Sequence, residues 1–264
     1  MDKISVIVPC YNEEESLPLF YKEINKVINK MKEVSFELIF IDDGSKDKTL
    51  NIVKGFSKDD SNIRYISFSR NFGKEAAIYA GLEYSIGDYI TLLDVDLQDP
   101  PKLIEKMYKI ITTEDVDIVA LKTDAHKEYG IVRRFFTSCY YKLISKLSKV
   151  EMVPGARDFR LMKRQVVDAV LELKEYNRYS KGIFSFVGFK TKWLTYEVPK
   201  RVAGNSKWSF FKLFTYAIDA IIGYSTVPLT IAVIVGVLFC LIALIAIIFI
   251  IIRTLIFGDS VAGW

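Results

Sequence analysis

The chain has 264 residues, enough for one large domain or two small ones, and its formal net charge at pH 7 is +4. So small a surplus, without a run of basic residues, argues against a nucleic-acid partner. The three cysteines, Cys10, Cys139 and Cys240, stand far apart without the spacing of a zinc site, which favours a reducing, cytosolic setting for the soluble part. Cys10 is predicted to be a small packing residue rather than a nucleophile.

Five short runs of apolar and β-branched residues alternate with helical patterns along the first half of the chain. The predicted strands are 4–9, 36–43, 63–68, 88–94 and 116–121, and the predicted helices are 12–32, 47–58, 74–85 and one that begins at Pro100-Pro101. This alternation indicates βαβ units, a mainly parallel sheet and therefore an α/β fold. In such sheets ligands bind beyond the carboxyl ends of the strands.

Polar clusters follow each of the first four predicted strands. They occupy residues 9–13, 42–45, 70–74 and 94–99. Any one of them is more often a turn than a site, but acids behind three strands and bases behind the other predict one site at one edge of the sheet. The chain has neither a GxGxxG after the first strand nor a GxxxxGK[ST], so neither a dinucleotide fingerprint nor a P-loop is supported.

The segment from Leu92 to Pro101 carries the strongest chemical signal. Asp94 and Asp96 stand at the end of the fourth predicted strand, and residues i and i+2 point the same way where the extended chain persists. Two carboxylates that face one point suit Mg2+ or Mn2+, which bind one or two carboxylates together with substrate phosphates. The alternative is an acidic turn that caps the following helix.

Taken together, four motifs resemble the family-two glycosyltransferases of GT-A fold, whose catalytic domain is Rossmann-like. The motifs are Val-Ile-Val-Pro-Cys-Tyr-Asn-Glu-Glu (6–14), Asp-Asp-Gly-Ser (42–45), Phe-Ser-Arg-Asn-Phe-Gly-Lys-Glu-Ala-Ala (68–77) and Asp-Val-Asp-Leu-Gln-Asp-Pro-Pro (94–101). They most resemble the polyprenyl-phosphate branch, which includes dolichyl-phosphate mannose synthase and bacterial undecaprenyl-phosphate glucosyltransferases. The resemblance covers essentially the whole chain.

The resemblance assigns roles on the donor side of the site. Pro9, Tyr11 and Glu13 would line the nucleotide base and ribose, with Asp43 reaching the base. The metal ion and the diphosphate would be held by Asp94 and Asp96, with Gln98 where dolichyl-type relatives use a third polar ligand. Two cations, Arg201 and Lys207, match a family loop that clamps the diphosphate.

On the acceptor side, the resemblance makes Asp158 a candidate for positioning the sugar or the acceptor, where the alternative is a helix or strand-end cap. It places Lys122, Arg134 and Ser138 near the acceptor phosphate. Residues 133–149 predict a helix with aromatic and basic faces, which fits either an anionic membrane surface or ordinary packing on the sheet.

The run from Thr226 through Ile252 has no charged residue and exceeds the roughly 20 residues that cross a bilayer. The predicted organisation is a GT-A domain (1–205), an interfacial amphipathic helix (206–225), a transmembrane helix (226–256) and a short tail (257–264). Bacterial relatives commonly have a second span here, so the tail indicates either a truncation or a single-span form. Basic residues before the span predict that the catalytic domain lies on the cytosolic side of the inner (plasma) membrane.

The resemblance therefore implies a single inverting transfer of a sugar from a nucleotide-sugar to polyprenyl phosphate. A UDP-hexose such as UDP-glucose fits better than a guanosine donor. One alternative is a polysaccharide synthase, although Gln-x-x-Arg-Trp is absent and one span is seen rather than several. Another is a catalytically silent membrane scaffold, against which the intact acidic and basic set argues. Whether the chain forms a homo-oligomer is left open.

Overall fold

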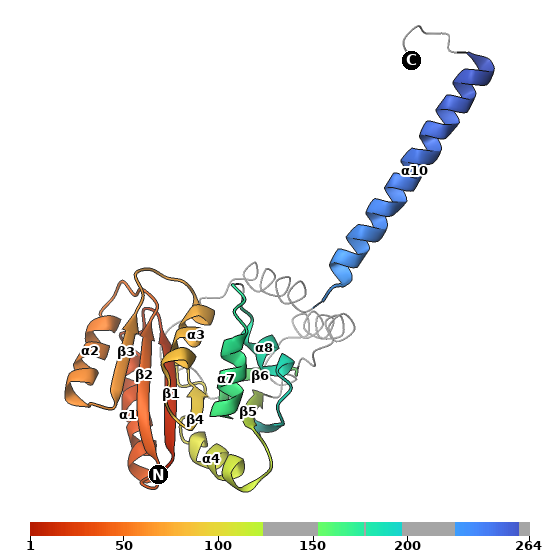
Figure 1. The fold of residues 1–264 in the computed structure, drawn as a ribbon. Helices are drawn as coiled ribbons and strands as arrows, with labels where there is room; N and C mark the ends of the chain where they lie inside the picture. The colour runs from red at the N-terminus through yellow and green to blue at the C-terminus, as the bar shows by residue number, and fades with distance from the viewer. Residues whose placement is uncertain (124–152, 177, 197–224, 259–264) are drawn as a thin grey trace.

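The computed structural model describes residues 1–123, 153–176, 178–196 and 225–258, which form an α/β domain followed by one long helix (Figure 1). The strands are β1 (Lys3–Cys10), β2 (Ser35–Asp42), β3 (Ile63–Ser67), β4 (Tyr89–Leu92), β5 (Ile118–Thr123), β6 (Ala156–Lys163) and β7 (Thr191–Tyr196). The helices are α1 (Leu17–Lys30), α2 (Thr49–Asp59), α3 (Lys74–Tyr84), α4 (Leu103–Thr113), α7 (Arg164–Glu172), α8 (Ser180–Phe186) and α10 (Val227–Phe257).

The strands form one sheet in the order β3-β2-β1-β4-β6-β5-β7. β1 pairs in parallel with β2 and β4, and β2 pairs in parallel with β3, so the predicted parallel sheet is confirmed for this half. β6 runs antiparallel to both β4 and β5, while β7 is parallel to β5. The carboxyl ends of β1 to β5 and the amino end of β6 therefore meet at the same edge, which we call the catalytic edge.

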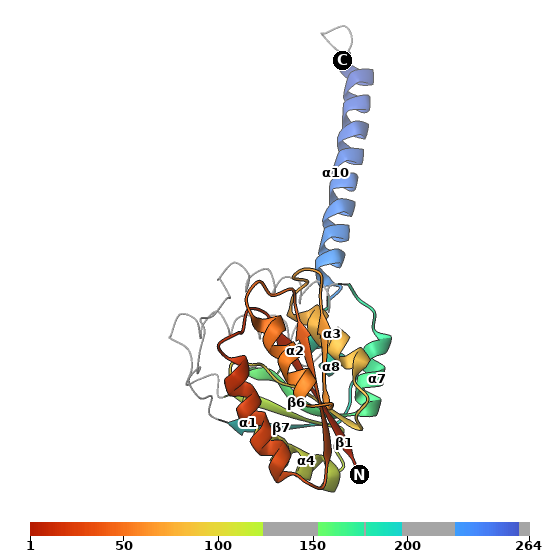
Figure 2. The same cartoon turned by 90° about the vertical axis from the view of Figure 1, so that its left-hand side faces the viewer.

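Helices cover both faces of the sheet (Figures 1 and 2). One core layer joins side chains of β1 and β2 to the buried faces of α1, α2 and α4. The other joins the opposite faces of those strands to α3, α7 and α8. Because β1 and β2 are buried on both faces, they are apolar almost throughout, which is the reason that their sequences are so easily recognised.

Several helices and strands begin or end at other residues than the sequence predicts. The first helix begins at Leu17 rather than at residue 12, because Asn12 has a left-handed φ of 52° and its segment forms a loop. β4 ends at Leu92 rather than at Asp94, and α4 begins at Leu103, so Pro100-Pro101 lies in the preceding turn. β6, β7, α7 and α8 were not predicted as elements.

The long helix α10 agrees with the predicted span to within one residue at each end. Its 29 residues from Leu229 to Phe257 make it a candidate membrane span by length and composition. At about 1.5 Å per residue it is longer than the roughly 30 Å hydrocarbon core of a bilayer. It begins on the side of the domain toward which β1 to β4 run (Figures 1 and 2). The 206–225 helix lies, except for Ser225, outside the described residues, as does the 133–149 helix, and the domain boundaries stay predictions.

Candidate active site

The loops that follow β1 and β2 are joined by hydrogen bonds at the catalytic edge. The backbone amide of Asn12 donates to Oγ of Ser45 at 2.9 Å, and Oδ1 of Asn12 accepts from the amide of Lys46 at 2.8 Å. The amide of Glu13 donates to Oγ1 of Thr49 at 2.7 Å. The two segments expected to line a nucleotide therefore form one connected rim, held by contacts between residues more than 30 positions apart.

Asp43 connects this rim to the loop before α3. Its carboxylate is 4% exposed and accepts from the amide of Phe72 at 2.6 Å and from the amide of Gly73 at 2.9 Å. Burial raises the pKa of this carboxyl, and the hydrogen bonds from the two backbone amides oppose that rise. Each carboxylate oxygen has a second lone pair, so these two hydrogen bonds do not use up the capacity of Asp43 to accept others.

Gly44 lets that loop approach. Its φ is +67°, and a Cβ atom there would lie 2.5 Å from the carbonyl carbon of Arg70 and 2.8 Å from its Cα atom. Because these are backbone atoms, no side-chain rotation could relieve the contact. The glycine of Asp-Asp-Gly-Ser is therefore required both by its backbone conformation and by the packing of residues 70–73.

Both acids lie beyond the end of β4, and Asp96 lies in the turn that follows. Asp94 and Asp96 are partly exposed while Val95 between them is 3% exposed, so the alternation of faces continues past the end of β4. Oδ1 of Asp96 accepts from the amide of Gln98 at 3.1 Å, which closes the turn. Among the described residues no group of three or more His, Cys, Asp or Glu side chains could hold a metal ion. Two carboxylates suffice where substrate phosphates complete the coordination, so the donor set fits Mg2+ or Mn2+.

Lys74 lies at the centre of these acids. Its Nζ atom is 2.7 Å from Oδ1 and 2.8 Å from Oδ2 of Asp94, and 2.7 Å from Oδ2 of Asp158. Asp158 reaches this point because β6 is antiparallel, which brings the start of that strand to the catalytic edge. A lysine at the start of α3 thus joins the turn after β4 to the first residues of β6.

Charge pairing dominates the protonation of this cluster. Burial by itself would lower the pKa of the Lys74 ammonium, but Asp158 and Asp94 outweigh it and the pKa is raised. Burial would likewise raise the pKa of the Asp158 carboxyl, but Lys74, followed by Lys181, holds it well below its usual range. The Lys74 ammonium and the Asp158 carboxylate are therefore both charged near neutral pH.

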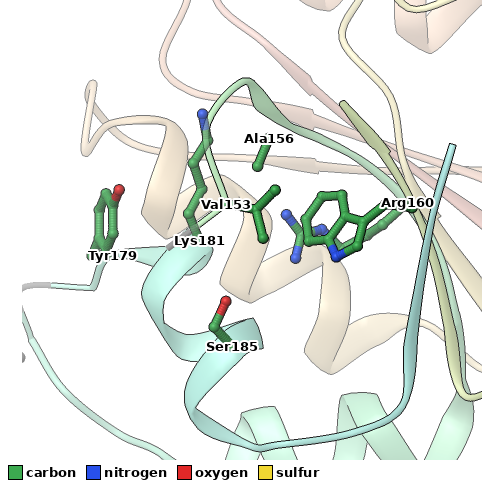
Figure 3. A pocket seen from close by; sticks show the side chains of 7 residues that line it. Val153, Ala156, Arg160, Tyr179, Lys181 and Ser185 are labelled. Atoms are coloured by element: carbon green, nitrogen blue, oxygen red, sulfur yellow. The ribbon is translucent and has the colours of Figure 1, made fainter. Parts of the chain in front are cut away.

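A small hollow lies between β6, β7 and α8 (Figure 3). Its lining includes the guanidinium of Arg160, which is 3% exposed, and the side chains of Lys181 and Ser185. Arg160 donates to the carbonyls of Asp158 at 3.2 Å and Arg157 at 3.0 Å, and its guanidinium stacks on Phe184. Burial lowers the pKa of Arg160 to about 10 despite the nearby acids. These contacts hold the backbone that carries Asp158.

A second ion pair, between Asp99 and Arg157, links the segments that carry the acids. Asp99 is 1% exposed and accepts from Nε of Arg157 at 3.0 Å and from the hydroxyl of Tyr196. It therefore joins the turn after Asp96 to the start of β6 and the end of β7. Burial raises the pKa of the Asp99 carboxyl, and Arg157 opposes that rise.

The structure brings together part of the predicted site. Those of its residues that lie at the catalytic edge are Pro9, Tyr11, Glu13, Asp43, Asp94, Asp96, Gln98, Lys122 and Asp158. Lys122 lies on β5 near this edge, where it pairs with Ala156 of the neighbouring strand β6. Arg134, Ser138, Arg201 and Lys207 lie outside the described residues, and all assigned roles stay predictions.

The sequence reasoning placed Lys74 and Asp99 in the polar clusters of the predicted site but gave neither a role, and it gave none to Arg157 or Tyr196. The available signal for Lys74 was its position directly after Gly73 in one of the quoted motifs. Cys10, in contrast, behaves as expected: its thiol is 2% exposed and donates to the carbonyl of Val8 at 3.3 Å. Burial, with the nearby acids, raises the pKa of that thiol well above its ordinary value, which excludes a ready thiolate nucleophile.

The fold is that of the GT-A glycosyltransferases. The glucosyl-3-phosphoglycerate synthase of Mycobacterium tuberculosis, solved in complex with Mn2+, UDP and phosphoglyceric acid, superimposes with a TM-score of 0.52 at 18% identity, over 83% of this chain and 76% of that one. The likeness concerns the fold alone.

Residues 5–171 match the family model described as glycosyl transferase family 2. The bactoprenol glucosyl transferase of Shigella phage SfX is 39% identical over 266 residues, 99% of this chain and 85% of that protein. The prophage bactoprenol glucosyl transferase homolog of Escherichia coli K12 shows the same identity and coverage. The chain belongs to glycosyl transferase family 2, and the resemblance inferred from its motifs is confirmed.

Proposed function

We propose that this glycosyltransferase moves a hexose from a UDP-sugar to polyprenyl phosphate, with inversion at the anomeric carbon and with UDP-glucose as the first donor to test. The observation that carries the proposal is the gathering of Asp94, Asp96 and Asp158 at the catalytic edge beside the connected loops after β1 and β2. Relatives that align over 99% of the chain are named for glucosyl transfer to bactoprenol, which supports the acceptor and the sugar.

The donor would occupy the rim formed by the first two loops. Its base and ribose would lie against Pro9, Tyr11 and Glu13, with Asp43 at the base. Asp94 and Asp96, with Gln98, would hold Mg2+ or Mn2+, and the Mn2+ complex of a protein of similar fold is consistent with this. When bound, the divalent ion would neutralise negative charge on the departing diphosphate.

The acceptor needs little general-base help, because a phosphate monoester is already ionised near neutral pH. One of its oxygens attacks the anomeric carbon while the bond from that carbon to the diphosphate oxygen breaks, and UDP leaves with the electron pair. The protein's task is to orient the two anions and to stabilise the leaving group. Asp158 would position the sugar or the acceptor. The acceptor phosphate would contact Lys122, Arg134 and Ser138, and the diphosphate would contact Arg201 and Lys207.

The acceptor's polyprenyl chain requires a membrane, and α10 is a candidate anchor for the domain. With the N-terminal side of α10 in the cytosol, the catalytic edge would face the cytosolic leaflet of the inner membrane, where soluble nucleotide-sugars are present.

The proposal is tested with the full chain in detergent, polyprenyl phosphate, Mg2+ or Mn2+, and a panel of labelled nucleotide-sugars. We expect label from one UDP-hexose to enter a mild-acid-labile lipid, and chelation to stop the transfer. Asp96→Asn should reduce turnover on the order of a hundredfold or more, because it removes a ligand charge at the diphosphate. The matched control is Asp168→Asn on α7, whose side chain is 62% exposed and remote from the site. Full activity of Asp96→Asn would contradict the metal assignment, and the absence of a lipid product from every donor would contradict the acceptor.

A further inference from the structure

Lys74 is held in place by the backbone around it. It is the first residue of α3, directly after Gly73, whose φ of +97° sets the direction in which the helix starts. The amides of Phe72 and Gly73 are both bound by Asp43, so the lysine's backbone is anchored to the end of β2. Its side chain is 34% exposed, which means that it is neither fully buried nor free to sample solvent.

The ammonium group uses its donors on two acids from different strands. The distances to both oxygens of Asp94 and to Oδ2 of Asp158 are 2.7 to 2.8 Å, so its three N–H donors all have acceptors in reach. Asp94 is also the acid that the proposed function gives to the metal ion. A second cation at Asp94 would be repelled by the ammonium only a few ångströms away. A nucleoside diphosphate carries several negative charges and would offer the ammonium another partner.

We propose that Lys74 is the internal counter-cation of Asp94 and Asp158, and that it keeps Asp94 a weak metal ligand until a nucleoside diphosphate arrives to take over the lysine's charge. The inference rests on the proposed function for the identity of the metal-binding acids. It makes binding of metal and nucleotide mutually dependent, since each is weakened when the other is missing. A site built in this way does not hold a divalent ion tightly without its substrate.

The test measures Mn2+ binding rather than sugar transfer. Free Mn2+ is followed by electron paramagnetic resonance with the full chain in detergent, with and without UDP. For the wild type we expect weak binding that UDP strengthens at least several-fold. Lys74→Gln should bind Mn2+ more tightly without UDP, on the order of tenfold, and should lose most of the strengthening by UDP. Lys26→Gln makes the same change of charge on α1, where Lys26 pairs with Glu23 and is 62% exposed, and should match the wild type.

Two further variants decide the matter if Lys74→Gln does not fold. Lys74→Arg keeps the positive charge and should keep the strengthening of Mn2+ binding by UDP. Asp158→Asn removes one of the two acids that pair with Lys74. The ammonium would then pair more closely with Asp94, so Mn2+ binding without UDP should weaken. The inference is overturned if UDP leaves wild-type Mn2+ binding unchanged, if Lys74→Gln fails to tighten it, or if Asp158→Asn tightens it. Because no acceptor lipid is used, failure of lipid glycosylation in the activity assay is distinguishable from failure of the metal–nucleotide coupling.

Discussion

Replacing Gly44 with Ala should damage both the stability and the nucleotide site, because the residue is constrained in two ways. An alanine at φ +67° is strained by about 1 to 2 kcal/mol. Its Cβ atom would also meet the backbone of Arg70 and Asn71 at 2.5 to 2.8 Å, so residues 70–73 would have to move. That movement would lengthen the two hydrogen bonds from backbone amides to the Asp43 carboxylate. Hydrogen bonds to a charged acceptor contribute about 1.5 kcal/mol or more each.

Allowing for partial relaxation, the total is about 3 kcal/mol, which corresponds to a fall in the unfolding midpoint of about 6 to 12 °C for a domain of this size. The displaced loop carries Lys74, so affinity for UDP in the presence of Mn2+ should also fall. Thermal unfolding monitored by circular dichroism and calorimetric titration with UDP, both on the full chain in detergent, measure the two effects.

The matched control is Gly55→Ala in α2, where an added Cβ atom meets nothing within 4 Å and φ is helical. There the better helix propensity of alanine should leave the midpoint unchanged or raise it, by up to about 1 kcal/mol of stability. A midpoint for Gly44→Ala within about 2 °C of the wild type, on the order of the measurement error rather than of the strain, would refute the claim that the Asp43–Gly73 loop depends on this glycine.

Three other results are expected. Asp99→Ala leaves the guanidinium of Arg157 and the hydroxyl of Tyr196 without their shared acceptor and should cost about 3 kcal/mol, whereas Asp99→Asn keeps an acceptor and should cost less. Since burial raises the folded-state pKa of the Asp99 carboxyl, its contribution to stability is fully present below the unfolded pKa and is lost as pH rises through the folded pKa. The thermal unfolding midpoint of Asp99→Asn, compared with that of the wild type, should therefore be higher at pH 7 than at pH 4. The opposite trend would show that the raised pKa of Asp99 does not govern this pH dependence. Cys10 should resist iodoacetamide at pH 7 in the folded protein and react after denaturation, as followed by mass spectrometry of its peptide; fast labelling of the folded state would show that the thiol is not buried.

Local patterns were enough to predict five of the seven strands that the structure describes and the position of the catalytic edge. β1 and β2 are apolar because both of their faces are buried, and the polar residues after β1 to β4 follow from the way in which parallel strands end. Asp94 and Asp96 were found because alternation along the chain survives the end of the strand. The long apolar helix, a candidate membrane span, was evident from the uncharged run of residues 226–252.

What the sequence could not supply is the set of contacts between distant segments. Lys74 meets Asp94 across 20 residues and Asp158 across 84, and Asp99 meets Tyr196 across 97. Nothing in the local pattern indicates that β6 enters the sheet antiparallel between β4 and β5, yet that reversal is what brings Asp158 to the catalytic edge. Residue types and their order along the chain therefore determined which groups could do the chemistry. The tertiary structure decided which of them meet, because a charge pair depends on distance in space and not on separation in sequence.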